Sequence, residues 1–147
     1  MQLTAFQLDA AISATRAILP LDLPADALMR RFFQEHPALG ARDRTVIAET
    51  VFGILRHRFF LEHCAQHITP RALVLAYLAK FGNINLRQLS GMVNSSESKW
   101  LAEIKALHID TLPLPIQAEL PQWLVEKLQK SMSDQAILDL GLALQKS

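Results

Sequence analysis

Apolar residues recur every three or four positions along almost the whole chain, a spacing that places them on one face of an α-helix. No stretch alternates apolar and polar residues in the manner of a half-buried strand, and no Asn-Gly dipeptide marks a hairpin turn. We also find no internal repeat. These patterns predict an all-α fold.

Capping residues indicate where individual helices begin. Asp43 is predicted to be the N-cap of the longest helix, 43–66, because its carboxylate can accept hydrogen bonds from the free amides of the first turn. Thr69 followed by Pro70 is typical of an N-cap and the first helical residue after it. The residues that follow, 72–79, are apolar nearly all round, so we expect this helix to lie inside a bundle.

Proline becomes frequent in the last third of the chain. Three of the seven prolines lie within 113–121, which indicates an extended connector with one short turn. Helical spacing resumes after it, and Ser133 precedes the last helical segment. We therefore predict one helical domain over 1–112 and a C-terminal helical linker extension over 113–147.

Composition limits the class of protein. Half of the 147 residues are hydrophobic and a fifth are charged, which suffices for a hydrophobic core. The formal net charge of +1 does not by itself indicate nucleic-acid binding. The single cysteine, Cys64, excludes an intrachain disulfide and suits a reducing compartment, and no apolar run reaches the ~18–20 residues that span a bilayer. We expect a cytoplasmic protein without a membrane partner.

Motifs that carry catalysis or bind cofactors are not found in the sequence. It contains neither a glycine-rich phosphate loop nor a Gly-x-Ser-x-Gly elbow. Cys64 has no neighbour that would lower its pKa, so we interpret it as a structural thiol. His63 and His67 have a spacing that can bind a metal on a helix, but no third ligand is evident, and two surface histidines are the favoured alternative. We therefore assign no catalytic residue, metal or cofactor to this chain.

Arginines gather in the segment 30–62, which has six of them against four acids, a local charge of +2. Guanidinium groups suit phosphate recognition, although a solvated helix face is an equally good interpretation. Along the predicted helix 43–66, most apolar residues fall in one arc and most polar residues in the opposite arc. Arg58 falls on the apolar arc and is predicted to pair with an acid. Phe52 and Phe60 fall on or beside the polar arc, which indicates either additional core residues or a surface for docking another domain.

Two motifs resemble a known family. In the first, Asp43-Arg44 opens a long helix whose residues 49–56 read Glu-x-Val-aromatic-Gly-x-Leu-Arg. In the second, the segment 118–128 contains Leu-Pro-Gln-Trp-Leu. Together with the flanking segment 31–42, they resemble the N-terminal NusB-like domain, and the linker after it, of bacterial Sun-type (RsmB/NOP family) RNA cytosine-C5 methyltransferases. The resemblance covers most of the chain.

This resemblance implies a NusB-like helical bundle followed, in the family, by a catalytic domain that uses S-adenosylmethionine and paired cysteines. It implies an accessory domain that positions 16S ribosomal RNA or packs against its own C-terminal catalytic domain. On this interpretation the expected RNA contacts are Arg42, Arg44 and Arg56, followed by Arg30 and Arg31. A purely structural role for Arg44 at the start of its helix is equally compatible with the sequence.

Two other hypotheses belong to different classes. In the first, the chain is a protein–protein interaction module or a stand-alone NusB-like antitermination factor, and Phe52 or Phe60 contacts a protein partner. In the second, the chain is itself an enzyme, a hypothesis that no motif supports.

Overall fold

The computed structural model describes residues 2–146, which form ten α-helices and one 3-10 helix and contain no β-strand. The predicted all-α fold class is confirmed. The elements are α1 (Ala5–Ile18), α2 (Ala25–Glu35), α3 (Ala41–Arg56), α4 (Arg58–Cys64), α5 (Pro70–Lys80), α6 (Leu86–Leu89), α7 (Ser95–Ala106), η1 (Ile109–Thr111), α8 (Leu114–Ala118), α9 (Gln122–Leu128) and α10 (Asp134–Gln145).

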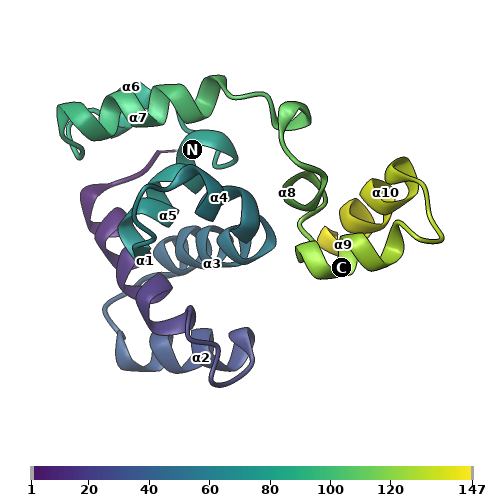
Figure 1. Cartoon of the computed structure of the whole chain (residues 1–147). Helices are drawn as coiled ribbons and strands as arrows, with labels where there is room; N and C mark the ends of the chain where they lie inside the picture. The colour runs from purple at the N-terminus through teal and green to yellow at the C-terminus, as the bar shows by residue number, and fades with distance from the viewer. Residues whose placement is uncertain (1, 147) are drawn as a thin grey trace.

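Helix α5 lies in the middle of the bundle, as its uniformly apolar sequence predicts. It packs against α1, α3, α4 and α7, and Figure 1 shows it surrounded by these helices. Four consecutive residues, Leu73 to Ala76, are completely buried. The Thr69 hydroxyl accepts a hydrogen bond from the Ala72 amide at 3.1 Å, so the predicted N-cap is also confirmed.

The predicted continuous helix 43–66 is wrong, because the chain bends at His57 and divides it into α3 and α4, the second of which ends at Cys64. The His57 ring stacks on Phe81, with the ring centroids 3.8 Å apart. The bend turns Phe60, which a straight helix would carry beside its polar arc, into the core, where it is 1 % exposed. The bend thereby buries a large aromatic ring that a straight helix would leave beside its polar side chains.

Asp43 is not the N-cap of α3, which is Gly40. Asp43 lies three residues further on, where one carboxylate oxygen accepts a hydrogen bond from the Gly40 amide at 3.2 Å. Its other oxygen accepts a hydrogen bond from the buried Gln7 side chain at 2.9 Å. Gln7 also completes the capping box of α1 with Thr4, so this network joins the first turns of α1 and α3.

The buried apolar residues form two clusters. The first extends from Leu3 to Ile104, and the second contains Ala118, Leu120, Val125 and Ile137. Helix α8 packs against both α4 and α10, and Figure 1 shows α9 and α10 beside the bundle rather than within it. The last two helices are therefore attached to the bundle mainly through α8.

Candidate functional site

Four of the five predicted RNA-contacting arginines lie on α2 and at the start of α3, the two helices on either side of the loop 36–40. Two of them are exposed on α2, and two are exposed in the first turn of α3. We call these residues the arginine face; they are Arg30, Arg31, Arg42 and Arg44.

Arg44 is held at the α2–α3 junction by two contacts. Its guanidinium carbon lies 5.4 Å from the centroid of the Phe33 ring of α2. Its Nε–H donates a hydrogen bond to the carbonyl oxygen of Leu39 at 3.0 Å. These contacts give Arg44 a structural role at the start of α3 while its side chain remains exposed.

The positive charge of the arginine face is not neutralised by ion pairs. Among residues 2–146 the ion pairs are Arg58–Glu62 at 2.6 Å and Arg71–Glu97 at 2.9 Å, and neither includes a member of this face. Asp43, the acid between the two arginines of α3, is instead bound to Gln7 and the Gly40 amide. The Arg58–Glu62 pair confirms the predicted acid partner of Arg58.

Arg56 lies apart from the other four arginines. It is in the last turn of α3, twelve residues beyond Arg44, which corresponds to about 18 Å along the helix axis. It lines a groove of about 600 Å³ between α3 and α10, together with Phe52 and Lys146. We call this the α3–α10 groove. The structure therefore separates the predicted site residues into two groups.

Phe60 does not belong to a docking surface. It is 1 % exposed and its ring meets that of Phe81 edge-on, with centroids 5.6 Å apart. The prediction of a docking role for Phe60 is therefore wrong, because the bend at His57 turns α4 so that Phe60 faces the core and not the polar side expected of a straight helix. Phe52, by contrast, is half-buried and faces the α3–α10 groove.

Glu119 is a candidate site residue that the sequence analysis does not identify. It follows α8 in a left-handed conformation with φ of 55°, which directs its carboxylate at the first turn of α4. The two carboxylate oxygens accept hydrogen bonds from the amides of Phe59 at 2.8 Å and Phe60 at 3.0 Å. Only the tertiary fold brings Glu119 to these amides, sixty residues away along the chain.

Burial raises the pKa of Glu119 to about 7, although the hydrogen bonds from Phe60 and Phe59 act in the opposite direction. The negative charge of Glu62 is a smaller cause of the same increase in pKa. The pKa of this carboxyl group is about 7 in the folded state and has its ordinary value of 4.5 in the unfolded state. Between pH 4.5 and about pH 7, the folded state therefore binds more protons at this group than the unfolded state does. Folding stability therefore falls as the pH rises through this window.

We expect the protein to lose stability relative to Glu119→Gln as the pH rises from about 5 to about 8, because the amide variant has no carboxyl group to ionise at this position. Urea unfolding of both proteins across this range measures the difference. His57, whose pKa is lowered by burial and by the charge of Arg56, is present in both proteins. Its titration therefore contributes to the stability of both and drops out when the two are compared. A difference independent of pH would contradict the assigned environment of Glu119.

A second cleft, of about 410 Å³, lies between the segment before α5 and helix α7. Arg71 lines this cleft, and its Nε–H and Nη2–H donate to the two carboxylate oxygens of Glu97 at 2.9 and 3.1 Å. The Trp100 indole donates a hydrogen bond to the carbonyl oxygen of Cys64 at 3.0 Å. Because Arg71 and Glu97 neutralise each other, this cleft offers no clear preference for a charged ligand.

The histidine pair proposed from the sequence does not share one helix. Helix α4 ends at Cys64, so His63 is helical and His67 lies in the following bend. Within residues 2–146 no three His, Cys, Asp or Glu side chains are grouped so that they could hold a metal ion. Burial raises the pKa of the Cys64 thiol by more than the charge of Lys80 lowers it, which fits a structural role. The expectation that Cys64 has no neighbour that lowers its pKa is therefore wrong.

Comparisons of the chain with protein-family models, with curated proteins and with solved structures give no match. In the described part of the chain, no helix is long and apolar enough to cross a membrane.

Proposed function

We propose that this chain is an RNA-binding accessory module of a methyltransferase that modifies cytosine C5 in small-subunit ribosomal RNA. The observation that carries the proposal is the arginine face, four exposed guanidinium groups without an acidic partner within 4 Å among residues 2–146. The choice of RNA class and reaction rests on the resemblance of the two sequence motifs to Sun-type enzymes.

The chemistry of the arginine face suits phosphate groups. A guanidinium offers a planar set of N–H donors that matches two phosphate oxygens, and it stays charged at any physiological pH. Arg44 is already oriented by Phe33 and Leu39, so binding restricts its side chain less than that of a freely rotating arginine. With a net charge of only +1 for the whole chain, we expect weak binding that is sensitive to salt.

In this proposal, the chain and an associated catalytic domain have different roles. The module positions the RNA, and an associated catalytic domain in the cytoplasm supplies S-adenosylmethionine and the nucleophilic cysteine. Cys64, the single cysteine of this chain, supports this assignment of roles. It is half-buried and its thiol pKa is raised, whereas nucleophilic cysteines have a lowered pKa.

We expect the double variant Arg42→Ala/Arg44→Ala to bind a single-stranded ribosomal RNA fragment roughly tenfold more weakly than the unmodified chain. The slope of log Kd against log salt concentration should decrease by about 1.5, because each lost phosphate contact removes about 0.7 to 0.9 from it. Fluorescence anisotropy at several salt concentrations measures both quantities.

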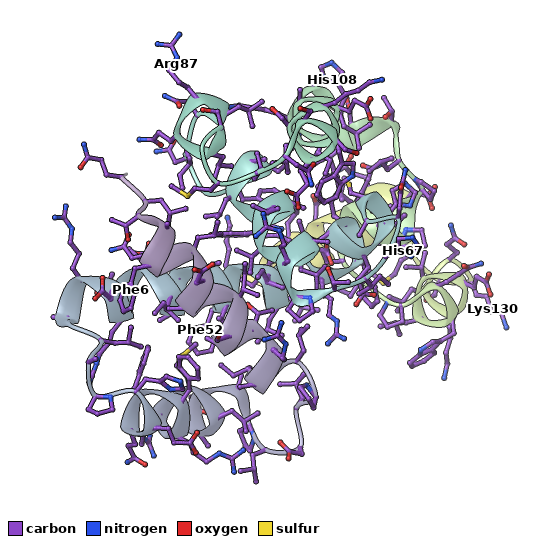
Figure 2. The ribbon with its side chains drawn as sticks, turned by 90° about the vertical axis from the view of Figure 1, so that its left-hand side faces the viewer. Phe6, Phe52, His67, Arg87, His108 and Lys130 are labelled. Carbon is purple, nitrogen blue, oxygen red and sulfur yellow. The ribbon has the colours of Figure 1, made fainter. Side chains whose placement is uncertain are left out.

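The control for this experiment is Arg87→Ala/Lys130→Ala, which removes the same charge. Both residues are exposed, and Figure 2 shows them on parts of the surface away from α2. The control should keep nearly all of the affinity. Equal losses in the two double variants would mean that RNA responds only to net charge, and the arginine face would then not be a binding site.

A further inference from the structure

The α3–α10 groove combines an apolar surface with positive charge, and its parts come from segments far apart in the sequence. Phe52 and Leu55 lie in the last turns of α3 and are half-buried, so each presents one side to the groove. Leu144 of α10 lines the same space and is 55 % exposed. A hydrophobic surface of this kind gains stability when an apolar partner covers it.

Two cations accompany this apolar surface. Arg56 and Lys146 both line the groove and both are exposed. Among residues 2–146, neither has an acid within 4 Å. The Arg56 Nε–H donates only a long hydrogen bond, of 3.4 Å, to the Phe52 carbonyl oxygen.

Among the described residues that line the groove, Glu119 is the one acid, and it does not balance these cations. Both carboxylate oxygens of Glu119 are hydrogen-bonded to the first-turn amides of α4. Burial also raises the pKa of Glu119 to about 7, so near neutral pH this group carries only part of a negative charge. The groove therefore has an excess of positive charge beside its apolar surface.

We propose that the α3–α10 groove binds a short acidic peptide segment of a protein partner. Apolar side chains of this peptide lie against Phe52, Leu55 and Leu144, and its carboxylates pair with Arg56 and Lys146. The charge complementarity selects an acidic partner over a neutral or basic one. The inference is independent of RNA binding by the arginine face, which lies at the opposite end of α3.

RNA fits this groove less well than a peptide does. Sequence-tolerant RNA binding uses several aromatic rings on which successive bases stack, and this groove has one aromatic residue, Phe52, beside aliphatic side chains. Apolar peptide side chains, in contrast, match an aliphatic surface, as amphipathic helices do in hydrophobic grooves.

The test is a selection of displayed random 12-residue peptides on the intact chain, followed by affinity measurements on the most enriched peptide after synthesis. We expect enriched sequences that combine leucine or phenylalanine with aspartate or glutamate. The selected peptide should bind Arg56→Glu/Lys146→Glu at least tenfold more weakly than the unmodified chain. Because both residues are exposed, these substitutions leave the core intact, which circular dichroism verifies.

The matched control is Arg87→Glu/Lys130→Glu, which changes the net charge by the same amount and should alter the affinity by less than twofold. The proposal is overturned by a selection without enrichment, by enriched peptides that lack acids, or by equal losses in the two double variants. It is also overturned if single-stranded RNA displaces the peptide from the unmodified chain but not from Arg42→Ala/Arg44→Ala, because the competition would then depend on the arginine face.

Discussion

Replacing Gly141 with alanine is expected to detach α10 from α8. A Cβ atom at this position would lie 2.1 Å from the carbonyl oxygen of Ala118 and 2.9 Å from its Cα. Because these are backbone atoms of α8, no rotation of a side chain relieves the overlap, and one helix must move. The movement opens the second apolar cluster, which contains the fully buried Ile137.

We expect the Gly141→Ala variant to be cleaved by trypsin after Lys127 and Lys130 at least tenfold faster than the unmodified chain. Because the overlap is with backbone, it costs about 3 kcal/mol, and the ~1 kcal/mol by which alanine favours a helix over glycine leaves a local destabilisation of about 2 kcal/mol. The unfolding of the first cluster should change little, because that cluster contains no residue of α9 or α10. Mass spectrometry of the digest identifies the sites.

The control for this substitution is Gly91→Ala. A Cβ atom there meets nothing within 4 Å, so the variant should resist trypsin as the unmodified chain does. If Gly141→Ala were as resistant as Gly91→Ala, the close approach of α10 to α8 would be refuted.

Replacing Phe60 with alanine is expected to lower the free energy of unfolding by about 3–5 kcal/mol. The ring is 1 % exposed and contacts Phe81 edge-on, so its removal leaves a cavity that the surrounding helices fill only in part. Urea unfolding followed by circular dichroism measures the loss. A change of this size is a large share of the stability of a domain of this length.

Phe59→Ala is the matched control, since this neighbouring ring on the same helix is 39 % exposed. We expect it to lose less than about 1 kcal/mol. Similar losses in the two variants would mean that Phe60 is not a core residue, and the original docking hypothesis for Phe60 would regain support.

The fold class and several helix starts are predictable from the sequence because they depend on local chemistry. Thr69 caps the helix that Pro70 opens, and Asn94 and Glu97 form a capping box at the start of α7. The central place of α5 follows from its uniformly apolar residues. In each case the determining residues lie within one or two helical turns of each other.

The bend at His57 is not predictable in this way, because its causes are distant along the chain. Phe81 stacks on the His57 ring, and Glu119 accepts hydrogen bonds from the first amides of α4. Without the bend, Phe60 is assigned to the wrong side of the helix. These tertiary contacts thus reverse the interpretation of a candidate site residue.

The candidate site is only partly predictable for the same reason. The local excess of positive charge indicates only the arginines of segment 30–62 as a group, and the family resemblance singles out Arg42 and Arg44, both of which are exposed in the structure. The sequence does not indicate that Arg56 shares a groove with Lys146, ninety residues later, since this requires the packing of α10 on α8. Helical periodicity does not determine which end of one helix meets another.

The most direct test of the proposed RNA site is an NMR titration of the isotopically labelled chain with a single-stranded ribosomal RNA fragment. Our account predicts that amide signals shift mainly over residues 29–31 and 40–45, around the arginine face. Absence of any shift at RNA concentrations in the millimolar range, or shifts confined to the α3–α10 groove, would contradict it.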